Sequence, residues 1–232
     1  MPNIKISGPD GIFDAYMSAP ASRTGPGLLV IQEIFGVNQV MRDLCDTFAA
    51  QGYIAICPDL FWRIQPNVEL TDQSQGDWNR AFELMNAFMP DFEKGVGDLL
   101  AAITKIRDME NCSGKVGCVG YCLGGSLSYA LACQSGSDAT VGYYPVQIDD
   151  ALSYAPNVKN PTLFHLAELD GFCPPESQEK IAEAFGRNPN IIFHKYPKVD
   201  HAFARKGGSN FDENAATLAD QRTANFFKVN LA

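Results

Sequence analysis

The residues best suited to covalent chemistry lie at positions 120–124, Gly-Tyr-Cys-Leu-Gly. An apolar run at 116–119 precedes them, and a helix-forming run at 126–132 follows. A nucleophile held on a sharp strand-to-helix turn needs small residues two positions before and after it, because the chain doubles back there. The following helix would also point its N-terminus at the sulfur, which favours thiolate. We therefore predict Cys122 as a nucleophile.

A thiol nucleophile needs a base, and the chain offers three histidines, His165, His194 and His201. His165 and His194 lie inside apolar runs that read as strands, where a hydrogen-bonded core histidine is the usual finding. His201 follows the last predicted strand, where a catalytic histidine falls in the chain order nucleophile, acid, histidine. We predict His201 as the base.

The acid that orients this base should end the preceding strand, and Asp170 does so. Its rivals are Glu168 and Asp200. Asp170 is followed by Gly-Phe-Cys-Pro-Pro, a stiff loop that can hold a carboxylate still. Asp200 adjoins the histidine and is expected to point elsewhere, so we predict Asp170.

The first long apolar run ends at residues 31–36, Ile-Gln-Glu-Ile-Phe-Gly. In sheets of this kind the loop after that strand supplies a backbone N–H to an oxyanion hole, together with the residue after the nucleophile. Ile34 and Leu123 are the predicted donors. Glu33 has two interpretations, a solvated carboxylate at a strand end or a residue of the site.

Short apolar runs alternate with amphipathic stretches, a pattern typical of a mostly parallel sheet with helices on both faces. The predicted strands are 27–33, 53–58, 115–121, 140–144, 162–166 and 191–196, with antiparallel edge strands at 4–17. The predicted helices are 38–50, 77–88, 92–109, 122–134, 176–185 and 214–229. No repeat or linker divides the chain, so one α/β domain over residues 1–232 is expected.

Bulk composition narrows the class of protein. The net charge of -9 and pI of about 4.8 exclude a partner that needs its phosphates neutralised, such as nucleic acid. No apolar stretch is long enough for a membrane span, and the first 14 residues do not read as a signal peptide. The seven cysteines are scattered, which predicts neither a disulfide framework nor a metal site. We expect a cytoplasmic monomer, with a dimer as the alternative.

The same residues carry a resemblance to the dienelactone hydrolase family, from about residue 25 to the C-terminus. The segments that match in order are Gln-Glu-Ile-Phe-Gly-Val-Asn at 32–38, Cys-Pro-Asp-Leu at 57–60, Gly-Val-Gly-Asp-Leu at 95–99, Gly-Lys-Val-Gly at 114–117, Gly-Tyr-Cys-Leu-Gly-Gly at 120–125, Val-Gly-Tyr-Tyr at 141–144 and His-Ala-Phe-Ala-Arg at 201–205. Together they are far more specific than the turn around the cysteine alone.

This resemblance implies the α/β-hydrolase fold and a Cys–His–Asp triad on Cys122, His201 and Asp170. It also implies that Glu33 lies near the thiol, and Arg205 near Glu33 and the substrate carboxylate. The implied activity is that of a carboxymethylenebutenolidase, which hydrolyses a dienelactone to maleylacetate in the degradation of (chloro)aromatic compounds. The resemblance implies no cofactor.

The sequence departs from the family pattern around the substrate. Where the well-known enzymes carry an arginine and, four residues on, a tyrosine, this chain has Trp78 and Phe82, and Ala202 replaces a serine. Arg80 lies two residues away from the first of these, on another helical face, and is a poor substitute. One positive charge for a substrate carboxylate is therefore lost, which argues against dienelactone itself but not against ester or lactone cleavage.

The expected substrate is a small-molecule ester or lactone, contacted by Arg205, Trp78, Phe82, Phe35 and Tyr144 and cleaved through a thioester on the cysteine. Two alternatives remain. One is a broader carboxylesterase or thioesterase acting on activated esters, with a hydrophobic pocket. The other is a non-enzymatic domain whose thiol serves as a redox or ligand-binding group.

Overall fold

The computed structural model describes residues 4–232, which form two compact units, residues 4–117 and residues 118–232. Strand β5 (Cys112–Tyr121) runs from the first unit into the second. The expectation of one domain over residues 1–232 stays a prediction. No helix in residues 4–232 has the length and apolar character that a membrane crossing needs.

Four strands of the first unit lie in the order β1-β2-β4-β3. Their bounds are β1 Ile4–Gly8, β2 Gly11–Ser18, β3 Gly25–Ile31 and β4 Ile54–Pro58. β1 pairs antiparallel with β2, and β2 pairs antiparallel with β4. β3 and β4 are parallel. The predicted antiparallel edge strands at 4–17 are therefore confirmed.

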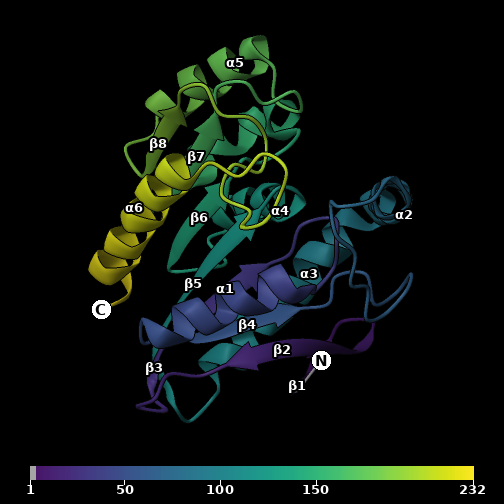
Figure 1. Cartoon of the computed structure of the whole chain (residues 1–232). Helices are drawn as coiled ribbons and strands as arrows, with labels where there is room; N and C mark the ends of the chain where they lie inside the picture. The colour runs from purple at the N-terminus through teal and green to yellow at the C-terminus, as the bar shows by residue number, and fades with distance from the viewer. Residues whose placement is uncertain (1–3) are drawn as a thin grey trace. The chain divides into compact units, whose positions relative to one another are not determined.

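Helices cover both faces of this first set of strands. The helices are α1 Gln39–Ala50, α2 Gln75–Phe88, the short 3-10 helix η1 Met89–Asp91 and α3 Phe92–Arg107. α1 begins where predicted, because the Asn38 side chain accepts a hydrogen bond from the Met41 amide. Gly27 faces α3, since a Cβ there would lie 2.2 Å from Ile106, whereas α1 packs its Cys45 thiol toward Cys57 of β4. Figure 1 shows α1 lying along β4.

The second unit is built on three parallel strands, β6 Ala139–Tyr143, β7 Thr162–Ala167 and β8 Ile191–Tyr196. Every residue of β6 and β7 is buried. Because successive side chains of a strand point to opposite faces, both faces of these strands must be covered. Phe164 and His165, neighbours in β7, show how. Phe164 packs against Phe185 of α5, and His165 is hydrogen-bonded to Thr223 of α6.

The helical elements of this unit are α4 Leu123–Cys133, the 3-10 helix η2 Ile148–Asn157, α5 Pro175–Gly186 and α6 Glu213–Leu231. α4, α5 and η2 surround the Phe164 face, where an apolar core gathers. α6 runs along β6 and β7 on the His165 face (Figure 1). The sequence analysis did not predict η2, which contains Pro156, a residue that normally interrupts helices.

Candidate active site

Cys122 lies on a strained turn between β5 and α4. Its backbone has φ 56° and ψ -117°, a conformation that costs free energy for any residue other than glycine. The turn is so tight that a Cβ on Gly120 would lie 1.9 Å from the Gly124 carbonyl oxygen. The Cys122 amide donates to the carbonyl of Tyr143 at 3.1 Å, which fixes the turn against the end of β6. The predicted sharp turn between strand and helix is present in the backbone, and the role of Cys122 as nucleophile stays a prediction.

The elbow leads directly into the first turn of α4. Leu123 is the first residue of this helix, so its N–H belongs to the group that finds no acceptor within the helix. The same end carries the positive pole of the helix dipole. Ser126, one turn on, accepts a 3.0 Å hydrogen bond from the Val146 amide and returns one to the Val146 carbonyl. The start of α4 is therefore held against the loop that follows β6.

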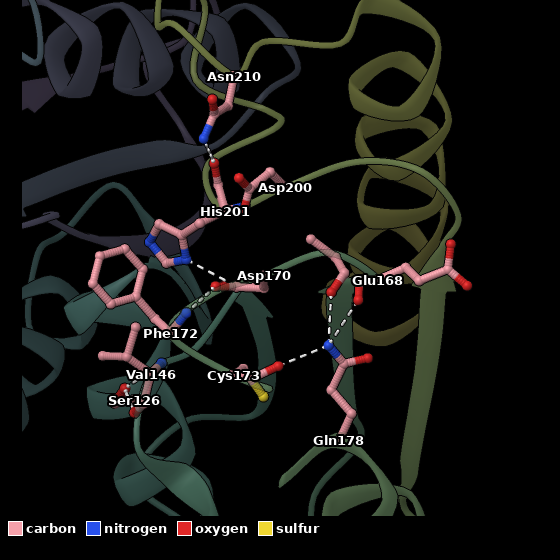
Figure 2. Close-up of polar contacts among 11 residues, drawn as sticks. Ser126, Val146, Glu168, Asp170, Phe172, Cys173, Gln178, Asp200, His201 and Asn210 are labelled. Carbon is pink, nitrogen blue, oxygen red and sulfur yellow. Dashed lines mark hydrogen bonds and ion pairs between the residues drawn. The ribbon is translucent and has the colours of Figure 1, made fainter. Parts of the chain in front are cut away.

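Asp170 and His201 form a buried pair (Figure 2). Asp170 Oδ2 lies 2.8 Å from His201 Nδ1, and both side chains are buried. The other carboxylate oxygen accepts from the Phe172 amide at 2.9 Å. With one oxygen bonded to the backbone and one to the ring, the carboxylate holds the imidazole in a single orientation.

The two rival acids make backbone contacts instead. Glu168 Oε2 accepts from the Lys198 amide at 2.9 Å, and Asp200 Oδ1 accepts from the His201 amide at 2.6 Å. Neither carboxylate is therefore the partner of the imidazole. The expectation that Asp200 points away from the ring is confirmed.

His201 is a buried histidine that favours its charged form. Burial lowers its pKa, but Cys122 and Asp170 outweigh that effect through charge and hydrogen bonding and raise it to about 10. Within residues 4–232, Nε2 has no hydrogen-bond partner, and the nearby Cys122 sulfur raises the pKa of the ring. The rings of Tyr144 and Phe172 approach the imidazole edge-on, with centroids 5.1 and 4.8 Å away.

The loops after β7 and β8 are joined by backbone hydrogen bonds, which brings the acid to the base. The Leu169 amide donates to the Val199 carbonyl at 2.9 Å, one residue before Asp170 in the first loop and two residues before His201 in the second. Asn210 donates from its side chain to the His201 carbonyl at 3.0 Å. Ala202, which replaces a family serine, has φ 63° and completes the turn after the histidine.

The other two histidines have different surroundings. His165 is fully buried, with Nδ1 2.8 Å from the Tyr196 hydroxyl and Nε2 2.9 Å from the Thr223 hydroxyl. Burial lowers its pKa well below 6.5, and His194 and Arg222 lower it further. The interpretation of His165 as a satisfied core histidine is confirmed. For His194 it is wrong, because this residue is only half-buried in β8.

The hydrogen-bond chain through His165 has one direction. Tyr143 donates to Asp220 at 3.0 Å, and since its hydroxyl has one hydrogen, it must accept from Thr223 at 2.7 Å. Thr223 in turn accepts from Nε2–H of the neutral His165, leaving Nδ1 to accept from Tyr196. The chain is therefore complete without any free ring nitrogen.

The remaining predicted residues of the strand-end segment lie in the first unit. Glu33, Ile34 and Phe35 are all buried, Glu33 with 2% of its surface exposed. The interpretation of Glu33 as a solvated carboxylate is therefore wrong. The roles of Glu33 and of the Ile34 amide stay predictions.

Trp78 and Phe82 of α2 form an aromatic cluster with Phe35. The Trp78 ring stacks on Phe82 with centroids 5.6 Å apart and meets Phe35 edge-on at 5.0 Å. Arg80 is held on another side by an ion pair with Glu83 at 2.7 Å. The cluster is apolar where the family pattern has a charged and a hydroxyl-bearing residue.

Arg205 is buried in the turn after His201, and its amide donates to the Ala202 carbonyl at 2.9 Å. Its predicted contact with a substrate carboxylate stays a prediction. Within residues 4–232, no group of three or more histidine, cysteine, aspartate or glutamate side chains could hold a metal ion.

Sequence reasoning missed two residues beside the Asp170–His201 pair. Phe172 is 48% exposed, and its ring lies against the imidazole. Gln178 of α5 is buried and donates to backbone carbonyls around Asp170. The sequence indicated only that position 172 lies in a stiff loop. A single glutamine near the start of a helix does not indicate which backbone carbonyls it will bind.

Comparison with known proteins agrees with this geometry. The profile of the dienelactone hydrolase family matches residues 13–231. A relative from Azospirillum brasilense is 48% identical over 241 residues, covering all of both chains. The carboxymethylenebutenolidase of Pseudomonas putida is 42% identical over 224 residues, 96% of this chain and 94% of its own. A crystal structure from Klebsiella pneumoniae has a TM-score of 0.85 at 24% identity and covers 97% of this chain and 96% of that one.

The fold is that of an α/β-hydrolase, as the structural likeness shows. The chain belongs to the dienelactone hydrolase family. It is a carboxylic ester hydrolase that acts on ester or lactone bonds. The alternative of a non-enzymatic thiol domain is thereby set aside.

Proposed function

We propose that the chain hydrolyses activated esters and enol lactones with Cys122 as nucleophile, His201 as proton carrier and Asp170 as the group that orients the histidine. The observation that carries this proposal is the 2.8 Å contact between Asp170 and His201, on a histidine whose pKa the neighbouring Cys122 raises. An imidazolium beside a sulfur is the arrangement in which thiolate is the stable partner.

In the first half of the reaction, the Cys122 sulfur bonds to the substrate carbonyl carbon and the carbonyl oxygen becomes an oxyanion. The Leu123 amide, at the positive end of α4, supports that charge, with the Ile34 amide as the second expected donor. The ester C–O bond then breaks, and the leaving oxygen takes the proton from His201 Nε2. The product of this half is a thioester on Cys122.

In the second half, neutral His201 takes a proton from water as the water oxygen bonds to the thioester carbon. Collapse of that intermediate breaks the C–S bond and releases the carboxylic acid. Thiolate and imidazolium are restored. Asp170, bonded to Nδ1, keeps the ring oriented and stabilises its charge through both halves.

A sulfur nucleophile restricts the substrates. A cysteine thiol has a usual pKa of about 8.5, so thiolate leaves the first intermediate far more easily than an alkoxide does. Simple alkyl esters should therefore return to reactants. Enolates and phenolates are better leaving groups, which favours enol lactones and aryl esters.

The test compares p-nitrophenyl acetate with ethyl acetate at equal enzyme concentration. We expect rapid hydrolysis of the aryl ester, little of the ethyl ester, and a thioester at Cys122 that mass spectrometry detects after a rapid acid quench. Equal rates on the two esters, or an acyl group on another residue, would contradict the proposal.

A broader carboxylesterase or thioesterase is the second candidate, favoured by the aromatic cluster of Phe35, Trp78 and Phe82. Apolar acyl groups gain more from such surfaces than a substrate carboxylate does. A panel of p-nitrophenyl esters, dienelactone and acyl thioesters separates the two. A rising kcat/KM with acyl length, together with no action on dienelactone, favours the second candidate.

A further inference from the structure

The side-chain amide of Gln178 is a junction of backbone hydrogen bonds around Asp170. Its Nε2 lies 2.7 Å from the Cys173 carbonyl oxygen, 3.0 Å from that of Ala167 and 3.3 Å from that of Glu168. Figure 2 shows these bonds fanning out from one nitrogen. Gln178 is buried. It lies in the first turn of α5, where its backbone N–H donates to the Pro174 carbonyl.

The acceptors stand on both sides of the predicted acid. Ala167 and Glu168 come from the end of β7, and Cys173 comes three residues after Asp170. One amide group therefore closes the loop that carries the carboxylate. The loop's own backbone hydrogen bonds are a 3.4 Å bond from the Asp170 amide to the Ala167 carbonyl and a 3.1 Å bond from the Cys173 amide to the Asp170 carbonyl.

The orientation of the amide is fixed by its surroundings. Three carbonyl oxygens converge on one side, and only the NH₂ end of a glutamine can donate to them. Oε1 is buried and has no hydrogen-bond partner in residues 4–232. A buried acceptor without a donor costs free energy. The side chain therefore keeps the hydrogen bonds of its NH₂ group, although its oxygen is left without one.

We propose that Gln178 is a positioning residue for the reaction. It clamps the loop after β7 so that Asp170 reaches His201 Nδ1, and it acts on the substrate only through that pair. The inference rests on the proposed function for its kinetic consequence, but the placement of Asp170 against His201 can be measured without any turnover.

The experiment compares wild type with Gln178→Met, which keeps the length of the side chain and removes its donors. We expect kcat for p-nitrophenyl acetate to fall between about tenfold and a hundredfold, because the orienting contact is displaced, with KM changed less than about twofold. NMR titration of the His201 imidazole should show a lower pKa than in wild type, since the Asp170 hydrogen bond is one of the interactions that raise it.

Gln178→Glu sharpens the test if the methionine variant folds poorly. A glutamate carboxylate would face three carbonyl oxygens, so the kinetic defect should be larger at neutral pH and should diminish in acid, where the group regains a proton to donate.

Ser177→Ala is the matched control. The neighbouring Ser177 also makes a side-chain hydrogen bond from α5, a part-buried one to Asp149 at 2.6 Å, and within residues 4–232 its hydroxyl makes none to the Asp170 loop. This variant should lose stability while the His201 pKa and kcat stay unchanged. An unchanged His201 pKa in both Gln178 variants, or an equal shift in the control, would overturn the inference. Absence of any hydrolysis by wild type would refute the proposed function and leave the titration as a valid test of the clamp.

Discussion

The second unit contains two buried histidines whose surroundings shift their pKa values in opposite directions. His165 has a neutral hydroxyl on each ring nitrogen, and its pKa is well below 6.5. His201 has a carboxylate on one nitrogen and the Cys122 sulfur near the other, and its pKa is about 10. Burial disfavours the charged form of both rings. The partners, and not the depth of burial, therefore distinguish the core histidine His165 from the proposed base His201.

The backbone around the two rings differs in the same sense. His165 lies in the middle of β7 with regular strand pairing on both sides. His201 lies in a turn between two residues with positive φ, Lys198 and Ala202. Both ring nitrogens of His165 are bonded to hydroxyls, whereas Nε2 of His201 has no hydrogen-bond partner within residues 4–232.

The largest effect on activity should come from removing the thiol of Cys122, which lies near His201. Cys122→Ala should lower kcat/KM for p-nitrophenyl acetate by about 10³-fold or more, because no thioester can form. Circular dichroism should show an unchanged fold. Activity within tenfold of wild type would place the nucleophile elsewhere.

The next largest effect tests the carboxylate. Asp170→Asn should lower kcat by about 10³-fold, because an amide cannot hold the imidazolium in the same way. The pKa of His201 should fall, which an imidazole NMR titration measures. Asp200→Asn is the control, since Asp200 bonds the backbone amide and not the ring. Equal losses in the two variants would refute the assignment of the acid.

The His165 side should respond in stability and not in activity. Thr223→Val removes the hydroxyl between His165 and Tyr143 and leaves a buried ring N–H without an acceptor. The free energy of unfolding should fall by about 1–3 kcal/mol in urea titrations. A large fall in kcat in this variant would contradict the assignment of His165 to a purely structural role.

The pH dependence of stability tests both histidines together. Unfolded His165 binds a proton below pH 6.5 and the folded residue does not, so its contribution is lost as the pH falls below that value. Folded His201 keeps its proton up to about pH 10, so its contribution is complete below pH 6.5 and is lost as the pH rises through 10.

Urea unfolding of wild type and His201→Gln as a function of pH measures both the loss of stability in acid and the loss in alkali. The difference between the two proteins should decline above pH 6.5 by at most about 1.4 kcal/mol per pH unit. The loss in acid should persist in the variant. A difference that does not change between pH 6.5 and 10 would contradict the raised pKa of His201.

Much of the site could be predicted because its residues stand at ends of elements that the sequence marks clearly. The elbow at Cys122 has an apolar strand before it and a helix after it, and Asp170 comes three residues after a mostly apolar strand that is fully buried. Strand bounds were less accurate. β5 begins at Cys112 and not at 115, because its first residues, Cys-Ser-Gly, are at most half-buried and form no apolar run.

The supporting contacts could not be predicted. Gln178 bonds to backbone carbonyls, which every residue has, so no side-chain pattern marks its partners. The Phe172 ring lies on His201 because two loops meet in space, a fact that spacing along the chain does not encode. His194 shared the apolar pattern of a core strand, yet β8 leaves that side chain half-buried.

The left-handed backbone of Cys122 sets chemistry and folding stability against each other. A glycine at this position would adopt φ 56° at little cost, so Cys122→Gly should melt at a higher temperature than Cys122→Ala while both are inert. A screen that rewarded thermal resistance alone would therefore tend to discard the sulfur. Any attempt to raise the thermal stability of this protein by random mutation should therefore keep Cys122 unchanged.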